Sequence, residues 1–255
     1  MNDSAVVVVP EPNNRVELCY RDEVRRTERM RGGVPPWTWL ELAPLLPLCD
    51  ALYINFISGL EMELGTAQAL RRGYRGPTYA DLHSLFLGVN RQGFRVPRAL
   101  EAWAAWLRCF DAVQMNEDEF ELLGAGGDPW QLTAGALGPE LKLIAVTMGP
   151  KGAAYVTSAG FDPDPTRWRS EPRVAVAERA HSGKIGPLEE VHSGDPTGCG
   201  DVWGATTFAR LLAGDTLEAA ITEANRLAAR NAAHRGASGL YRHLAGRLSH
   251  LEGHA

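Results

Sequence analysis

Short apolar runs alternate with longer helix-like patterns along most of this 255-residue chain. Runs of β-branched and other apolar residues are typical of buried strands, and apolar residues spaced three and four apart are typical of helices. Strands that alternate with helices predict an α/β fold with a mostly parallel central sheet covered on both faces. We expect strands at residues 5–9, 51–57, 78–82, 112–115, 143–147 and 153–157, and helices at residues 61–72, 97–110, 117–123 and 129–137. Pro97 would occupy the first helical position, where a missing N–H costs nothing.

The segment 158–187 breaks this alternation. It is rich in Pro, Gly, Arg and Asp, and only residues 174–177 look strand-like. An irregular hairpin or flap over a site and a solvated loop both fit this composition. Val191 and His192 are expected to close a strand after it.

Length and composition exclude several classes of protein. The chain fits one domain over residues 1–255, and its net charge of −5 disfavours a nucleic-acid-binding surface. The four cysteines are scattered without a CxxC pair, which predicts a reducing compartment rather than disulfides or a zinc site. No apolar run is long enough to cross a membrane, and no signal-peptide pattern precedes Val6. We therefore expect a cytoplasmic protein.

The turn Asp195-Pro196-Thr197-Gly198-Cys199-Gly200-Asp201 carries the strongest functional signal. It lies between an expected strand and an apolar helix over residues 200–213, which Gly214 would end. The small residues Gly198, Cys199 and Gly200 leave backbone N–H groups unobstructed at a helix N-terminus. This arrangement predicts an anion hole. A final helix through about residue 233 would begin with Asp215 as its cap and Glu218 in a capping box.

Asp201 has two interpretations. An acid in the first turn stabilises a helix, so capping alone explains it. A carboxylate beside an anion hole can also accept the proton of an alcohol that attacks a phosphoryl group. The residues alone leave both roles open.

The motif DPTGCGD followed by Val202-Trp203-Gly204-Ala205 resembles the C-terminal signature of the ribokinase-like, phosphofructokinase-B-type carbohydrate kinases. This resemblance implies a three-layer ribokinase-like sandwich and transfer of a phosphoryl group from ATP to a hydroxyl of a sugar or similar small molecule. It also implies that Asp201 is the catalytic base and that Gly198, Cys199 and Gly200 form the anion hole. Asp195 matches a residue that helps to bind a monovalent cation in some members.

Further motifs appear in the order that the family leads us to expect. Asn116 and Glu119 form an NxxE motif, which a helix capping box explains equally well. With the glycine-rich turn present, we expect them to organise Mg²⁺ and the phosphates. Thr147 and Gly149, in a turn that two glycines would suffice to explain, become candidate ATP contacts. Lys151 either reaches phosphate or points into solvent.

Two weaker candidates remain open between a structural and a functional role. Asn225 lies eleven residues before Gly236, a distance at which family members often place an Asn near adenine, but an Asn in mid-helix is often only exposed. Asp81 ends an expected strand, where such sheets bind ligands, or caps the following turn.

The likeness covers about residues 13–237, so we expect the chain to lack part of the usual N-terminal strands and lid. Gly32-Gly33 is not followed by the Asn of the family's sugar-recognition motif. A sheet edge left unpaired by missing strands would favour a homo-oligomer. Three hypotheses follow: an active kinase, a nucleotide- or metabolite-binding relative without catalysis, and a structural partner that binds neither.

Overall fold

A six-stranded sheet forms the centre of the computed structural model, which describes residues 6–20, 26–124, 127–170, 180–187, 194–234, 236 and 238–246. The strand order is β10-β9-β8-β7-β4-β3. Strands β3, β4, β7 and β8 run parallel, and β9 and β10 extend the sheet in antiparallel pairs. The bounds are β3 Leu52–Asn55, β4 Thr78–Asp81, β7 Ala112–Asn116, β8 Leu143–Thr147, β9 Ala153–Thr157 and β10 His181–Ile185. The expected mostly parallel sheet is confirmed.

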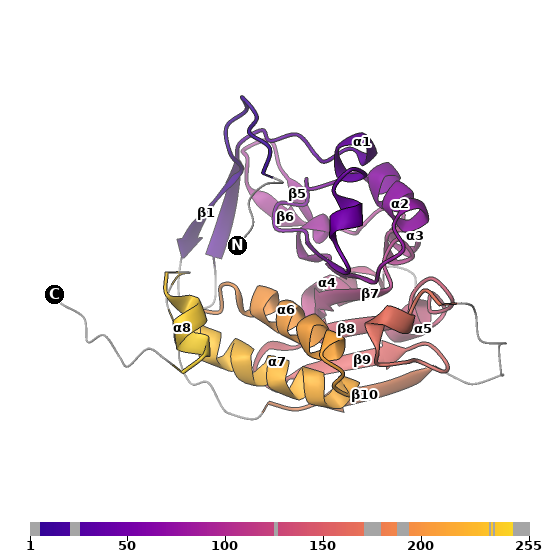
Figure 1. Ribbon diagram of the computed structural model, residues 1–255. Helices are drawn as coiled ribbons and strands as arrows, with labels where there is room; N and C mark the ends of the chain where they lie inside the picture. Colours follow the sequence, from indigo (N-terminus) through magenta and orange to yellow (C-terminus); the bar gives the residue numbers. More distant parts are fainter. Residues whose placement is uncertain are drawn as a thin grey trace.

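Successive side chains of the central strands face opposite cores, as the period of two of a strand requires. In β8, Ile144 and Val146 pack into one core, and Leu143 and Ala145 pack into the other. The first core is covered by α2 (Leu64–Gly73), α3 (Trp103–Leu107), α4 (Glu117–Leu122) and α5 (Pro129–Ala134). The second is covered by α6 (Cys199–Leu212) and α7 (Leu217–Ala232), as Figure 1 shows. The three-layer sandwich is thereby confirmed.

Two small antiparallel pairs lie outside the main sheet (Figure 1). They are β1 (Arg15–Tyr20) with β2 (Arg26–Arg31), and β5 (Leu87–Val89) with β6 (Arg95–Pro97). A backbone bridge between Arg29 and Phe94 joins the two pairs, and Arg95 lies 3.7 Å from Glu28. The other short elements are α1 (Trp39–Leu42), α8 (Leu240–Leu244) and 3₁₀ turns at Leu46–Leu48, His83–Phe86, Gly149–Lys151 and Pro165–Arg167. None of the helices in the described part of the chain is long and apolar enough to span a membrane.

Two expected elements differ from the structure. Residues 6–9 form no strand. The helix expected over 97–110 begins only at Trp103, and Pro97 instead ends β6. The reason is Ala102, whose φ of 52° lies in the left-handed region and stops a right-handed helix from extending towards the N-terminus.

The cap of α7 also differs from expectation. The Thr216 hydroxyl, not Asp215, accepts the Ala219 N–H at 3.2 Å. Asp215 pairs with Arg210 at 2.5 Å, and Glu218 accepts the Tyr155 hydroxyl at 2.8 Å. Within 158–187, β10 pairs with β9, so the hairpin interpretation holds for residues 181–185. The expected strand residues 174–177 and 191–192 lie outside the described part of the chain.

Candidate active site at the carboxyl edge of the sheet

Polar residues end each of the four parallel strands. Asn55, Asp81, Asn116 and Thr147 are the last residues of β3, β4, β7 and β8. Parallel α/β sheets bind ligands outside this edge, because the loops that follow the strands leave a crevice there. The N-terminus of α6 also reaches the edge, since Asn55 and Gln114 both bond to its first residues. The strands and the glycine-rich turn thus meet at one place.

The glycine-rich turn presents several backbone N–H groups. Gly198 caps α6 with a φ of 80°, a left-handed conformation that a side chain would strain. Within the described residues, the N–H groups of Gly198, Gly200 and Asp201 have no hydrogen-bond acceptor, whereas the Cys199 N–H donates to the Pro196 carbonyl at 3.1 Å. Unpaired N–H groups at the start of a 14-residue helix attract an anion.

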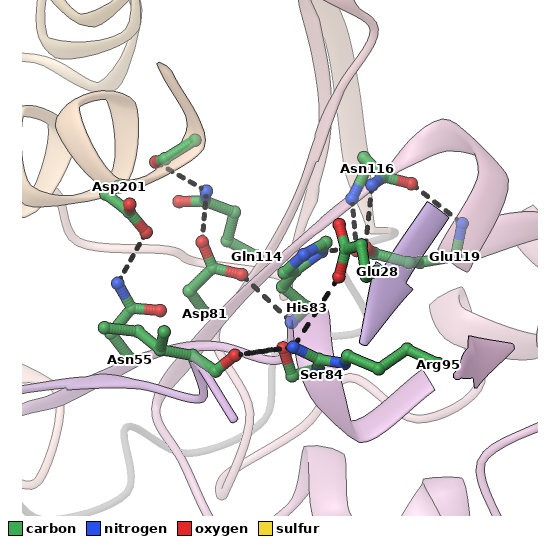
Figure 2. A network of polar contacts seen from close by, with 12 residues as sticks. Glu28, Asn55, Asp81, His83, Ser84, Arg95, Gln114, Asn116, Glu119 and Asp201 are labelled. Carbon is green, nitrogen blue, oxygen red and sulfur yellow. Dashed lines mark hydrogen bonds and ion pairs between the residues drawn. The ribbon is translucent and has the colours of Figure 1, made fainter. Parts of the chain in front are cut away.

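The Asp201 carboxylate is oriented by a residue that lies 146 positions earlier in the chain. Asn55 Nδ2 donates to Asp201 Oδ1 at 2.6 Å, as Figure 2 shows. Asp201 Oδ2 accepts no hydrogen bond from any described residue. The residue is exposed, so one carboxylate oxygen is fixed and the other is available to a guest.

Gln114 connects the sheet to the start of α6. Its Nε2 donates to Asp81 Oδ2 at 2.9 Å and to the Gly200 carbonyl at 3.0 Å (Figure 2). Its Oε1 accepts the Tyr79 hydroxyl at 3.2 Å. The residue is only 1% exposed, so water cannot replace these partners cheaply. The Gln114 amide therefore sets the position of Gly200 relative to the sheet.

Asp81 is a buried acid whose pKa is raised to about 7. Burial is the main cause, and the charges of Glu119 and Asp201 raise the pKa further. The His83 N–H, which donates to Asp81 Oδ1 at 3.1 Å, and the His83 side chain oppose this shift. Three carboxyl groups therefore share one edge of the sheet.

Asn116 and Glu119 form the expected capping box at the start of α4. The Glu119 N–H donates to Asn116 Oδ1 at 2.9 Å, and Glu119 Oε2 accepts the Asn116 N–H at 2.8 Å. Glu119 Oε1 accepts from Asn116 Nδ2 at 2.7 Å and contacts His83 Nδ1. Burial alone would lower the pKa of His83, but its bond to Glu119 and the Glu119 charge raise it.

The other residues predicted from the sequence lie at the margins of this edge. Gly149, with a φ of 53°, opens the turn after Thr147. Lys151 pairs with Glu117 at 2.8 Å on the surface. Asp195 Oδ1 accepts the Thr197 N–H at 2.9 Å and so shapes the glycine-rich turn.

Residues 88–242 match the model of the pfkB family carbohydrate kinases. The chain belongs to this family. The matched range holds Asn116, Thr147 and the glycine-rich turn, whereas Asn55 and Asp81 precede it. No curated protein matches the chain at a significant level.

Solved structures of ribokinase-family kinases share the fold of this pfkB-family chain. A sulfate complex of a pyrophosphate-dependent kinase in the ribokinase family has a TM-score of 0.66 at 18% identity, covering 92% of this chain and 74% of that one. Ribokinase from Thermotoga maritima has a TM-score of 0.66 at 17% identity, covering 94% and 70%. Arabidopsis thaliana ribokinase, complexed with ribose and ATP, has a TM-score of 0.58 at 15% identity, covering 92% and 70%. The ribokinase-like fold is confirmed.

Asn225 of this pfkB-family chain is buried and fully bonded. Its Oδ1 accepts the Trp203 indole N–H at 2.8 Å, and its Nδ2 donates to the Gly186 carbonyl at 3.0 Å. Asn231, two turns further along α7, donates to the Thr197 carbonyl at 3.0 Å. Asn231 therefore holds the glycine-rich turn, and Asn225 joins α6 to the segment after β10.

Sequence reasoning missed Asn55, Gln114 and Asn231 as parts of this site. None belongs to a motif, and each acts on a residue far from it in the chain. Asn55 carried one usable signal, because it is the one polar residue within the run expected to form a strand at 51–57. Gln114 is an amide at a fully buried strand position, which requires polar partners.

Proposed function

We propose that the chain transfers the γ-phosphoryl group of ATP to a primary hydroxyl of a sugar or a related small metabolite. The observation that carries this proposal is that the Asp201 carboxylate and several N–H groups without an acceptor lie together at the start of α6. Asn55 fixes one oxygen of the carboxylate, and the N–H groups of Gly198 and Gly200 have no acceptor among the described residues. A base beside an anion hole is what phosphoryl transfer to an alcohol requires.

In the proposed step, the acceptor hydroxyl oxygen forms a bond to the γ-phosphorus while the bond from that phosphorus to the bridging oxygen of ADP breaks. Asp201 Oδ2 accepts the hydroxyl proton. The N–H groups of Gly198, Gly200 and Asp201 stabilise the negative charge on the transferring group, because they are already oriented before the reaction. Cys199, whose N–H bonds to Pro196, contributes a small side chain rather than an N–H donor.

Magnesium would neutralise charge on the donor phosphates. Among the described residues, no three His, Cys, Asp or Glu side chains converge as metal ligands. This fits Mg²⁺, which usually keeps several waters and takes only one or two carboxylates plus phosphate oxygens. Asn116 and Glu119 would hold it, and the contacts of Glu119 with Asn116 and His83 fix the carboxylate in place.

The remaining assignments belong to the same proposal. Thr147 and Gly149 lie at the carboxyl edge and would contact the nucleotide. Asn225 would act on the nucleotide through the residues that it anchors, since its own amide is bonded. Asp195 would be the site for a monovalent cation.

A nucleotide- or metabolite-binding protein without catalysis is the second candidate. The observation that favours it is the Cys199 N–H, which is turned to the Pro196 carbonyl and so is withdrawn from the anion hole. Such a protein would bind the donor and transfer nothing.

A phosphotransfer screen tests the proposal. Mg-ATP and Mg-pyrophosphate would each be offered with sugars, inositols and nucleosides, because three neighbouring structures are of pyrophosphate-dependent kinases. We expect ATP-dependent transfer, and Asp201→Asn should lower kcat by about 10²–10⁴-fold with little effect on donor binding. The exposed Asp50→Asn is the matched control and should leave kcat unchanged. Equal turnover by Asp201→Asn and wild type would remove Asp201 from its role, and donor binding without any turnover would favour the second candidate.

A further inference from the structure

A cavity with basic side chains in its lining lies beside the amino ends of the parallel strands. Its volume is about 230 Å³, and its lining includes the basic side chains of Arg71, Arg75, Lys142 and Arg169 and the ring of Trp168. Arg71 and Arg169 both bond to Asp111, the residue immediately before β7. The cavity therefore adjoins the amino ends of the strands whose carboxyl ends form the candidate active site.

The buried carboxylate of Asp111 forms ion pairs with two of the four cations. Arg71 Nη1 donates to Asp111 Oδ1 at 2.5 Å, and Arg169 Nε donates to Asp111 Oδ2 at 2.8 Å. Asp111 has no exposed surface, and its Oδ2 also accepts the Thr78 N–H at 2.9 Å. Asp111 thus fixes both guanidinium groups, but its single charge balances only one of them.

The other two cations, Arg75 and Lys142, have no acidic partner among the described residues. No described residue forms a hydrogen bond or an ion pair with the side chain of Arg75 or Lys142. Burial lowers the pKa of Lys142, and the charge of Arg71 adds to this effect, while Asp111 opposes it. The neighbouring acid Glu140 is exposed. The cavity is therefore short of negative charge.

We propose that this cavity is a second ligand site, separate from the candidate active site, that binds a small phosphate-bearing anion. The planar fork of an arginine matches phosphate oxygens. Arg71 bonds to Asp111 through Nη1 alone and keeps its other N–H groups for a ligand. All three nitrogens of Arg169 are bonded, to Asp111, Tyr74 and Thr78, so Arg169 contributes fixed positive charge. Arg75 and Lys142 supply the charge that the buried carboxylate does not cancel. The volume lies below the 300–1,000 Å³ typical of sites for drug-sized ligands, which favours a small ligand such as phosphate or a sugar phosphate.

The two sites are well separated. Asp111 precedes β7 and Asn116 ends it, so the full length of a five-residue strand lies between them. At about 3.3 Å per residue this is roughly 16 Å, too far for one phosphate group to touch both.

Calorimetric titration of the whole chain with inorganic phosphate, and separately with ribose 5-phosphate, tests the proposal in the absence of Mg²⁺ and donor. We expect the double variant Arg75→Gln/Lys142→Gln to bind at least one of these probes about tenfold or more weakly than wild type, because each lost charged hydrogen bond weakens binding by roughly that factor. Arg72→Gln, an exposed change in α2 beside Arg71, should bind like wild type. Thermal unfolding would verify that the variants fold.

A third variant separates this cavity from the candidate active site. Gly198→Val strains the glycine-rich turn, whose φ at Gly198 is 80°, and leaves the basic cavity intact. Binding that persists in Gly198→Val and is lost in the double variant supports the second site. Binding that is lost in Gly198→Val, unchanged affinity in the double variant, or no binding of either probe to wild type would each overturn it.

Discussion

Asn55 controls which way the Asp201 carboxylate points. The 2.6 Å bond to Oδ1 is the only hydrogen bond to that side chain from a described residue, and it holds the exposed carboxylate against the edge of the sheet. In a site where transfer requires a hydroxyl in line with phosphorus, a displacement of about 1 Å can cost roughly 10² in rate. Asn55 is therefore a positioning residue for the proposed base.

Asn55→Ala should lower kcat by about 10–100-fold and leave the KM for the donor nearly unchanged. The reason is that the base loses its orientation while the phosphate-binding N–H groups stay in place. The measurement is steady-state kinetics in a double-mutant cycle with Asp201→Asn. If Asn55 acts through Asp201, adding Asn55→Ala to Asp201→Asn should cause little further loss. If the fold-losses in kcat of the two single variants multiply in the double variant, Asn55 has a role independent of Asp201.

The buried carboxyl group of Asp81 makes stability depend on pH. The folded protein keeps this proton to about pH 7, whereas the ordinary value for the unfolded chain is 3.8. Between these values the folded state binds more protons, so the free energy of unfolding falls as the pH rises from about 4 to 7. A shift of this size is worth on the order of a few kcal/mol. The pKa of His83 is also raised in the folded protein, so His83 likewise lowers the free energy of unfolding as the pH rises through that pKa.

Urea unfolding at pH 5 and pH 8, in EDTA, measures this dependence. In Asp81→Asn the stability difference between the two pH values should shrink markedly, because the variant side chain does not titrate. His83→Gln isolates the histidine contribution and should retain the part that belongs to Asp81. An Asp81→Asn protein with the full wild-type pH dependence would show that Asp81 is ionised in the folded state throughout this range.

At the scale of residues, the sequence did not predict the roles of the Gln114 and Asn231 side-chain amides. DPTGCGD and NxxE are contiguous, so their turn and capping box could be predicted from spacing alone. Gln114, by contrast, acts on Gly200 across 86 positions, and this partner appears only when β7 and α6 are brought together. Asn231 likewise bonds to Thr197 only because α7 packs beside the turn.

At the scale of elements, one glycine lets α6 pack directly against side chains of the sheet. A Cβ added to Gly204 would lie 2.2 Å from Gln114 Oε1 and 2.4 Å from the Tyr53 hydroxyl. The Tyr53 hydroxyl is buried and has no hydrogen-bond partner among the described residues. Any larger residue at position 204 would push the helix and its glycine-rich N-terminus away from the sheet.

Gly204→Ala should destabilise the fold by about 1–3 kcal/mol through overpacking. Gly65→Ala is the matched control, since Gly65 lies in α2, is exposed, and has no atom within 4 Å of its added Cβ. That change should stabilise by about 0.5–1 kcal/mol, because alanine loses less backbone entropy in a helix. Chemical denaturation of both variants compares them directly, and equal effects of the two changes would contradict the close packing of α6.

Strands were predicted more accurately than helix starts. Five of the six predicted strands, at 51–57, 78–82, 112–115, 143–147 and 153–157, correspond to β3, β4, β7, β8 and β9, because buried runs of this length have few alternatives. The sixth, at 5–9, was wrong, since residues 6–9 form no strand. The start of α3 was misplaced because Pro97 suits a first helical turn and an edge strand equally well. Only the left-handed Ala102 decides between them, and nothing in its sequence marks it.

For the whole molecule, alternation of strands and helices sufficed to predict the class of fold. It could not predict the β1–β2 hairpin, whose strands are charged and are placed by contacts such as Arg29 with Phe94 and Glu28 with Arg95. It also gave no indication of the basic cavity, because Arg71, Lys142 and Arg169 are far apart in the chain. Asp111, just before β7, gathers two arginines of the basic cavity, whereas Asn116, the last residue of β7, belongs to the candidate active site.

Binding of the phosphoryl donor should raise the free energy of unfolding of the whole domain. A ligand at about 100 times its Kd adds about 2.7 kcal/mol to the free energy of unfolding. For a domain of this size, 1 kcal/mol raises Tm by roughly 2–4 °C, so saturating Mg-ATP should raise Tm by roughly 5–10 °C. Asp201→Asn should keep this shift, because it removes the proposed base and leaves the N–H groups. Gly198→Val should lose it, because it disturbs the turn that carries them. A wild-type protein whose Tm does not respond to Mg-ATP or to Mg-pyrophosphate would reject both the kinase and the nucleotide-binding candidate, since each requires the donor to bind the folded state.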